Sequence, residues 1–346
     1  MIRRPLVLLA LLLSGCAQTY VHTKHTDGLR SEPANRSWSM SEEGNWSSLQ
    51  PWTFMGVEGT LVETPNWEIY TTIDNERFVN FLPDFYEAAL EHYRTALGEL
   101  PAPPRPMETY LFGDRRQWKN KTRMILPDKA ASFEGLGRGG FTTNGIAVLY
   151  DIDGYGWHRD TLALGSHEGW HQYVQTTFKD QLPVWLDEGV ATTMEGFSWR
   201  RGLQFRTDAN RERWSRLRTC ILENRMIPLD LLLSTHPERF LDGHKQTLLD
   251  YYAQIWAFAR YLEEAEDGRY RDRVGNVLLL AASGDLYRQL LRSDQLTDER
   301  RAQVEEDSEA GLAVLEVFIE GDVSALQERY WDWCRTLVGA PARSAS

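Results

Sequence analysis

The first half of the chain alternates between strand-like and helix-like patterns of apolar residues. Residues 67–73 are rich in β-branched and aromatic side chains that alternate with polar ones, which predicts a strand. Asp74 can cap a helix that follows this strand. Apolar residues recur along this helix every three or four positions, at Phe78, Phe81, Leu82, Phe85, Leu90, Tyr93 and Leu97. Further strands are predicted at residues 107–112 and 145–150, with a helix near 115–122 between them. This alternation predicts an α+β fold with helices packed against a sheet.

Beyond residue 158, the apolar residues recur with a helical period almost to the end of the chain. Helices are expected at residues 159–178, 184–197, 208–224, 246–264, 270–282, 297–318 and 324–338. The aromatic residues of the last helix fit a core more simply than a binding site. We therefore expect one folded domain over residues 56–340, with an α+β lobe at about 56–182 and a mainly helical lobe at about 183–340.

The start of the chain carries a short apolar run behind two arginines. The run covers residues 6–13 and is too short to span a bilayer permanently, so residues 1–15 are predicted to be a secretory signal peptide. The junction Leu-Ser-Gly-Cys ending at Cys16 resembles the lipobox of bacterial lipoproteins, which implies cleavage before Cys16 and lipidation of its thiol. With Ala17 next, this resemblance implies an anchor in the outer membrane and a protein that faces the periplasm. An ordinary signal peptide with an incidental cysteine is the alternative.

Residues 16–55 are rich in Ser, Glu, Asn and Gly and show neither a helical nor a strand period. They are predicted to be the lipidated amino terminus and a tether. Trp38, Trp46 and Trp52 are unusual in a tether and suggest that its far end packs on the folded domain.

Candidate metal ligands lie in the stretch Ser-His-Glu-Gly-Trp-His at residues 166–171. On a helix, His167 and His171 are one turn apart on the same face and can bind one metal ion. A catalytic zinc ion takes three protein ligands, and Glu188 on the next predicted helix is the candidate for the third. Glu168 lies beside the metal without binding it, where its carboxylate can accept a proton from water. The alternative is that these are two ordinary polar histidines that lie one helical turn apart by chance.

The stretch Trp-Leu-Asp-Glu-Gly-Val-Ala-Thr-Thr-Met-Glu at residues 185–195 forms a second motif. Together, HEGWHQ and WLDEGVATTME resemble the gluzincin metallopeptidases, and most closely the bacterial peptidase MA-like domains. The resemblance implies a zincin-like fold, Zn²⁺ as the cofactor and a peptide or protein as the substrate. It implies zinc binding by His167, His171 and Glu188, a base at Glu168, and a glutamate at Glu195 that orients a ligand histidine.

The same resemblance suggests two further features, and a third feature, aminopeptidase specificity, does not follow from it. Gluzincins commonly place a Tyr or His over the metal to stabilise the oxyanion, and Tyr252 in a Tyr-Ala-Gln unit is the best match, with Tyr251 and His244 behind it. A tyrosine buried in the core is the alternative for this position. A strand before the metal helix would hold an extended substrate, with residues 141–150 as candidates. The aminopeptidase motif Gly-Ala-Met-Glu-Asn is not visible upstream, so aminopeptidase specificity does not follow.

The amino-acid composition argues against some classes of binding partner. Acidic residues outnumber basic ones, 50 against 38, and this balance argues against nucleic acid or anionic lipid headgroups as partners. Hydrophobic residues make up 42% of the chain, which is enough for a substantial core. Beside Cys16, the two cysteines Cys220 and Cys334 either pair or stay free and buried.

The sequence thus favours zinc-dependent peptide-bond hydrolysis by a lipoprotein of the bacterial envelope. A non-catalytic zincin-like lipoprotein that binds or scaffolds other molecules is the main alternative. A zinc hydrolase of another amide or an ester would use the same residues. The sequence leaves the oligomeric state open.

Overall fold

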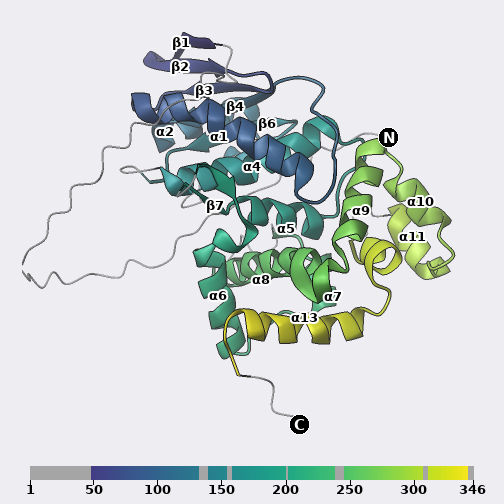
Figure 1. The fold of residues 1–346 in the computed structure, drawn as a ribbon. Coiled ribbons are helices and arrows are strands. Elements are labelled where there is room, and N and C mark those ends of the chain that lie inside the picture. Colours follow the sequence, from purple (N-terminus) through teal and green to yellow (C-terminus); the bar gives the residue numbers. More distant parts are fainter. Residues whose placement is uncertain are drawn as a thin grey trace, which may run out of the picture.

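The computed structural model describes residues 48–131, 139–153, 158–199, 202–237, 245–306 and 311–341. These residues form a mixed α+β structure, as the alternation of strand and helix patterns predicted. In Figure 1 the sheet lies at the top, and the helices of the second half of the chain lie below it and to its right.

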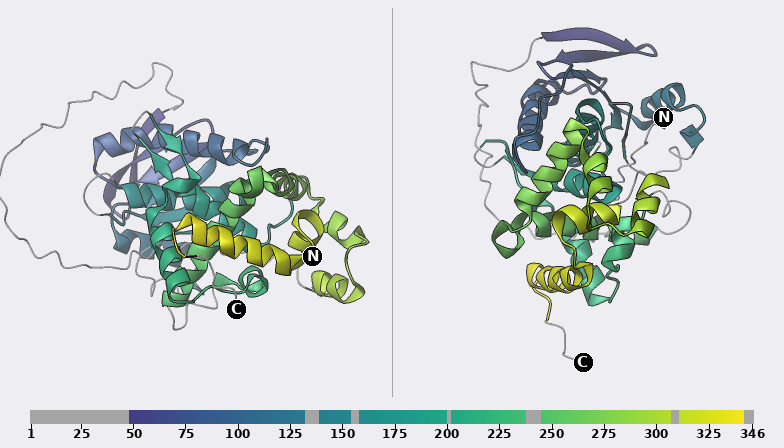
Figure 2. Two further views of the ribbon diagram at one scale, coloured as in Figure 1. Left: turned by 60° about the horizontal axis from the view of Figure 1, so that its bottom comes forward. Right: turned by 90° about the vertical axis from the view of Figure 1, so that its right-hand side faces the viewer.

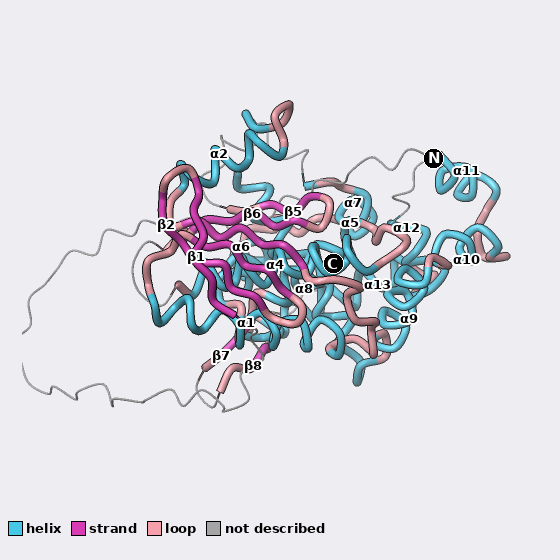
Figure 3. The backbone as a smooth tube through the Cα atoms, turned by 90° about the horizontal axis from the view of Figure 1, so that it is seen from above, coloured by secondary structure: helices cyan, strands magenta, loops and turns pink. Residues whose placement is uncertain are grey.

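A six-stranded sheet forms one end of the molecule, with the strand order β1-β2-β3-β4-β6-β5. Its strands are β1 (Ser48–Phe54), β2 (Val57–Glu63), β3 (Trp67–Thr71), β4 (Met107–Phe112), β5 (Phe141–Thr143) and β6 (Ile146–Tyr150). The neighbours β3, β4 and β6 are parallel, whereas the other pairs are antiparallel. Figure 3 shows these strands from above, over the helices. Within the described residues, β5 is an edge strand that pairs only with β6.

The start of the folded part differs from the sequence prediction. The tether was expected to reach residue 55, but the sheet begins at Ser48. The physical reason is aromatic packing, because Trp52 and Phe54 of β1 lie against Phe112, with ring centroids 6.3 and 4.7 Å away. Pro51 is tolerated in this strand because β1 is at the edge of the sheet. The expectation that Trp52 packs on the domain is therefore confirmed, and the expected boundary at residue 56 is wrong.

The described helices follow the predicted positions along most of the chain. They are α1 (Glu76–Thr95), α2 (Arg115–Ile125), α4 (Arg159–Thr177), α5 (Val184–Met194), α6 (Arg211–Leu222), α7 (Leu229–Ser234), α8 (Lys245–Glu264), α9 (Arg271–Ser283), α10 (Leu286–Arg292), α11 (Asp298–Glu306), α12 (Gly311–Val314) and α13 (Val323–Leu337). The short helices α7 and α10 were not predicted, because six or seven residues are too few for a periodic pattern. In the stretch expected as one helix at 297–318, residues 315–319 form a π-helical turn after α11 and α12.

Helix α5 ends earlier than residue 197, where the sequence placed its end. The chain turns at Gly196 into a short hairpin of β7 (Phe197–Ser198) and β8 (Gln204–Phe205). A Cβ atom on Gly196 would lie 2.1 Å from the carbonyl oxygen of Arg206, so only glycine fits this close approach.

The two faces of the sheet pack against different helices. On one face, Trp67 packs on Tyr86 of α1, and the Thr109 hydroxyl donates a hydrogen bond of 2.9 Å to α4. On the other face, the ammonium group of Lys121 in α2 lies 3.5 Å from the ring centre of Tyr110. Helix α4 is therefore held directly beneath the sheet, where 13 of its 19 residues are buried.

Helix α5 lies between α4 and α8, and thus joins the sheet end to the helical end (Figure 1). The right-hand view of Figure 2 shows the β1–β2 hairpin and α13 at opposite ends of the molecule. Cys220 and Cys334 are both buried and both free. Of the two alternatives left open by the sequence, a disulfide or two buried thiols, the structure therefore has the second. Within the described residues, no helix combines the length and the apolar character that crossing a membrane requires. The signal peptide and Cys16 lie outside the described residues.

Candidate metal centre

Helix α4 presents two histidines to one point. His167 and His171 are one turn apart, and their Nε2 atoms lie 3.1 Å from each other. The opposite side of α4 must approach α1 closely, and Gly169 makes this possible. A Cβ atom there would lie 2.7 Å from the Tyr93 hydroxyl oxygen. The glycine inside the HEGWH motif therefore fixes the depth at which the two imidazoles lie.

Helix α5 supplies the third group. The Oε2 atom of Glu188 lies 3.5 Å from Nε2 of His167 and 3.7 Å from Nε2 of His171. All three side chains are buried, and one ligand atom from each lies within 4.8 Å of the others. Neither carboxylate oxygen of Glu188 receives a hydrogen bond from any described residue. A buried carboxylate without a donor, facing two imidazole nitrogens, is suited to bind a metal ion.

Each histidine is oriented from behind by a carboxylate. Nδ1 of His167 lies 2.9 Å from Oε1 of Glu195, and Nδ1 of His171 lies 3.1 Å from Oδ1 of Asp187. An N–H at Nδ1 that donates to a carboxylate leaves the lone pair of Nε2 for a metal. Glu195 thus lies where a residue that orients a histidine is expected.

Asp187 has a role that the sequence reasoning missed. Its Oδ1 atom also accepts a hydrogen bond of 2.8 Å from Nε1 of Trp170, so it faces α4 and not the metal position. Its position next to Glu188 could have indicated this role. Adjacent residues on a helix point in different directions, so one of them can bind the metal while the other contacts a ligand histidine.

Two residues from α6 and the loop before it complete the support of Glu195. The guanidinium group of Arg213 donates to both carboxylate oxygens, at 2.9 and 3.2 Å, and the side chain of Asn210 donates to Oε2 at 2.5 Å. Nothing in the sequence marked these residues, because a single Arg or Asn in a polar stretch gives no sign that it is buried.

Glu168 lies next to the ligands but does not join them. Its Oε2 atom accepts a hydrogen bond of 2.7 Å from the hydroxyl of Thr142 in β5, and its Oε1 atom has no partner among the described residues. Burial raises the pKa of Glu168 to about 7, although the nearby histidines oppose this. A carboxyl group with such a pKa can exchange a proton near neutral pH.

Tyr252 of α8 lies on the His167 side of the centre. Its ring is 6.5 Å from the His167 ring, in an edge-to-face arrangement, and the Arg213 guanidinium lies 5.1 Å from the centre of the Tyr252 ring. Tyr251 and Tyr252 are both fully buried, and burial raises the pKa of each phenol. His244 lies outside the described residues.

The charges of the centre favour a bound cation. Burial lowers the pKa of His167 and of His171, but their carboxylate partners outweigh burial and raise both values above normal. Burial raises the pKa of Glu188, but the two histidines reverse this and hold it near 2. Four carboxylates, those of Glu168, Asp187, Glu188 and Glu195, surround the two imidazoles. Arg213 adds a positive charge to this group through its ion pair with Glu195.

Searches against protein-family models, curated proteins and solved structures found no match to this chain. The geometry therefore carries the assignment by itself. A buried group of His167, His171 and Glu188, with an orienting carboxylate behind each histidine, could hold a metal ion.

Proposed function

We propose that this protein is a zinc-dependent metallopeptidase with a zincin-like fold that hydrolyses peptide bonds in the bacterial envelope. The observation that carries the proposal is the spacing of the three ligand atoms, at 3.1, 3.5 and 3.7 Å. Zinc bonds of about 2.0–2.2 Å in a tetrahedral site separate neighbouring ligand atoms by roughly 3.3–3.5 Å. Two histidines and one carboxylate also match the ligand set of many catalytic zinc sites, which leave one position open. The resemblance of the two motifs to gluzincins supports the same assignment.

When bound, zinc would polarise the scissile carbonyl and make the attacking water more acidic. Glu168 accepts the proton of that water and passes it to the leaving amine, because its Oε1 atom has no hydrogen-bond partner among the described residues while Thr142 holds Oε2. The phenol of Tyr252 donates a hydrogen bond to the developing oxyanion. The edge of β5 that faces away from β6 would offer backbone groups to an extended peptide once the segments that bury residues 141–143 move, and Thr142 lies in this strand.

A cleavage screen on a peptide library, combined with elemental analysis of the purified chain, tests the proposal. We expect about one zinc per chain and a set of cleaved peptides whose yield falls about 100-fold or more in Glu168→Gln. Zinc at one per chain with no cleaved peptide would reject the peptidase function while retaining the metal site. An active preparation whose Glu168→Gln variant is equally active would point to a contaminating peptidase.

One observation favours a second candidate, a binding or scaffolding protein with a structural metal. His167, Glu168, His171 and Glu188 are each 1% exposed or less, so a substrate can reach them only if surrounding segments move. A structural zinc site, however, is normally closed by a fourth protein ligand. The described residues supply a group of three. We therefore retain hydrolysis as the first candidate.

We further propose that Cys16 is lipidated and anchors the protein in the outer membrane, facing the periplasm. The basis is the apolar run with its Leu-Ser-Gly-Cys ending. One acyl chain binds membranes only marginally, so two or more are expected. The intact mass of the mature protein tests this, and a mature terminus other than Cys16 would reject it.

A further inference from the structure

Arg213 is a buried cation at the back of the candidate metal centre. Only 3% of its surface is exposed. Its Nη2 atom donates to Oε1 of Glu195 at 2.9 Å, and its Nε atom donates to Oε2 at 3.2 Å. The same Oε1 atom lies 2.9 Å from Nδ1 of His167. A two-point contact with a planar guanidinium fixes the rotation of a carboxylate, which a single hydrogen bond does not.

Glu195 lies in the wall of a cavity, although only 4% of its surface is exposed. This cavity has a volume of about 220 Å³, and Glu195 is one of its lining residues. Asp160 and Ala163 from the start of α4, and Asn210 and Glu212 at the start of α6, also line this cavity. A glutamate has several rotatable bonds, so a carboxylate at the edge of a cavity keeps one orientation only if polar partners hold it. Arg213 and Asn210 are these partners.

Arg213 also contacts Tyr252, a second side chain that lies beside His167. Its guanidinium carbon lies 5.1 Å from the centre of the Tyr252 ring. The Tyr252 ring is in turn 6.5 Å from the His167 ring. One side chain therefore contacts both the carboxylate behind the histidine and the tyrosine beside it.

We propose that Arg213 is a positioning residue of the metal centre, which acts on His167 through Glu195 and holds the Tyr252 ring. On the other side of the centre, the partner of His171 is Asp187, which accepts a hydrogen bond from the neutral Trp170 and forms no ion pair with an arginine or lysine of the described residues. Of the proposed function, this inference requires zinc binding by the centre and does not require peptide hydrolysis. Its test therefore measures zinc affinity and does not require a substrate.

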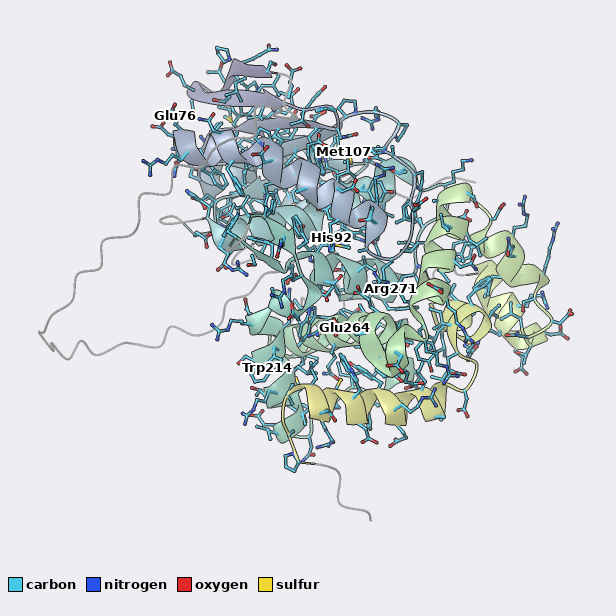
Figure 4. The ribbon with its side chains drawn as sticks, in the orientation of Figure 1. Glu76, His92, Met107, Trp214, Glu264 and Arg271 are labelled. Carbon is cyan, nitrogen blue, oxygen red and sulfur yellow. The ribbon has the colours of Figure 1, made fainter. Side chains whose placement is uncertain are left out.

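The test is the dissociation constant for zinc, measured by competition with a chromophoric chelator. The variants are Arg213→Met, Arg213→Lys, Glu195→Ala and the double variant of Glu195→Ala with Arg213→Met. Arg260→Met is the matched control. Arg260 is also buried, also donates to both oxygens of a glutamate, Glu264, at 2.9 and 2.7 Å, and also lies against an aromatic ring, that of Trp256. Glu264 is labelled in Figure 4, on α8.

Removing a group that orients a metal ligand typically weakens metal binding by about 10- to 100-fold. We expect Arg213→Met to raise the dissociation constant about tenfold, and Arg213→Lys about threefold, because lysine keeps the charge but loses the two-point contact. The double variant should bind zinc no more weakly than Glu195→Ala alone, because Arg213 acts through Glu195. Arg260→Met should lower the melting temperature and leave the zinc affinity unchanged.

Three results would overturn the inference. The first is a zinc affinity in Arg213→Met, or in Arg213→Lys if the first variant does not fold, that is within about 1.5-fold of the unmodified protein. The second is an effect of Arg213→Met that persists in full when Glu195 is already alanine. The third is an equal loss of affinity in Arg260→Met, which would indicate general destabilisation. Failure of the unmodified protein to bind zinc would reject the proposed function itself.

Discussion

The two sides of the metal centre are built differently, although each places a carboxylate behind a histidine. Behind His171, Asp187 is held by Trp170, so the whole arrangement lies within two consecutive helices. Behind His167, Glu195 is held by an arginine and an asparagine that come from beyond the β7–β8 hairpin. The first side is neutral apart from its carboxylate and histidine, whereas the second carries a further buried charge, that of Arg213.

This difference separates what local sequence encodes from what the fold assembles. The His171 side needs only that α4 and α5 pack together, and both helices carry recognisable motifs. The His167 side needs α6 to reach the same point. A buried Arg–Glu pair is a weak stabiliser at best, but removing one partner leaves an uncompensated charge and is costly. We therefore expect the two sides to respond alike in metal affinity and differently in stability.

The largest effect should come from Glu188, the ligand that both sides share. Among the described residues, Glu188 supplies the one carboxylate that faces both Nε2 atoms, so Glu188→Ala should lower zinc affinity by more than about 100-fold, beyond the usual loss for a residue that only orients a ligand. The stabilisation that zinc gives to the folded state should disappear with it, by about 3 kcal/mol at a zinc concentration 100 times the dissociation constant. Elemental analysis and thermal melts with and without zinc measure both effects.

The control for this experiment is Glu168→Gln. This variant should keep about one zinc per chain, because Glu168 accepts a hydrogen bond from Thr142 and is not a metal ligand. If Glu168→Gln loses its zinc and Glu188→Ala keeps it, the two roles are reversed. If both keep it, the third ligand lies elsewhere.

Tyr252→Phe should have the next largest effect, confined to turnover. If the phenol stabilises the oxyanion, kcat should fall about 100-fold while zinc content stays near one per chain. The ring, and with it the contact to Arg213, is retained in this variant. An unchanged kcat would place Tyr252 in the core and leave the role to Tyr251 or His244.

The elements and the candidate ligands could be predicted from the sequence because they depend on short-range patterns. His167, His171 and Glu188 stand out through helical spacing, and the structure brings their ligand atoms to within 4.8 Å. The α+β class follows in the same way from alternating periods of apolar residues. Glu195 was reached only through the resemblance, and it lies against His167.

The features that were missed depend on contacts between distant segments. Strand β1 was assigned to the tether because its polar residues and Pro51 leave no strand period, although Trp52, which packs on Phe112, was noted as unusual there. Arg213 gave no signal because burial of a single cation depends on where α6 lies in three dimensions. The end of α5 at Met194 depends on the close approach of Gly196 to Arg206. None of these contacts produces a periodic pattern of apolar residues in the sequence.

Replacing each orienting carboxylate in turn compares the two sides directly. Asp187→Ala and Glu195→Ala should each weaken zinc binding by about 10- to 100-fold, because both leave a ligand imidazole without its partner. Glu195→Ala should lower the free energy of unfolding by about 3–5 kcal/mol, because Arg213 is left buried and unpaired. Asp187→Ala should cost only about 1–3 kcal/mol, the penalty for unsatisfied hydrogen bonds.

Chemical denaturation of the metal-free variants measures this difference without interference from zinc. Equal losses of stability would mean that the unpaired Arg213 charge costs no more than unsatisfied hydrogen bonds do, and the contrast between the two sides would then vanish.

The smallest expected effect concerns a third histidine, His92, which lacks the carboxylate that both metal-centre histidines have. It lies on α1 (Figure 4), stacks on Phe205 with ring centroids 5.3 Å apart, and its Nε2 atom has no hydrogen-bond partner among the described residues. Burial lowers the pKa of His92 to about 4, the reverse of the shift at His167 and His171.

Between that value and the ordinary pKa of about 6.5, the unfolded chain binds more protons at this position than the folded one. The contribution of His92 to stability is therefore complete above about pH 6.5 and is lost as the pH falls toward 4. His92→Phe keeps the stacking on Phe205 and removes the titration. Between pH 7 and pH 4.5, the unmodified protein should lose about 1–2 kcal/mol more of its unfolding free energy than His92→Phe, a value reduced from the full shift because the ring is partly exposed. Parallel stability curves for the two proteins would show that His92 takes up its proton in the folded state as easily as in the unfolded one, and that a buried histidine here does not need a carboxylate to become charged.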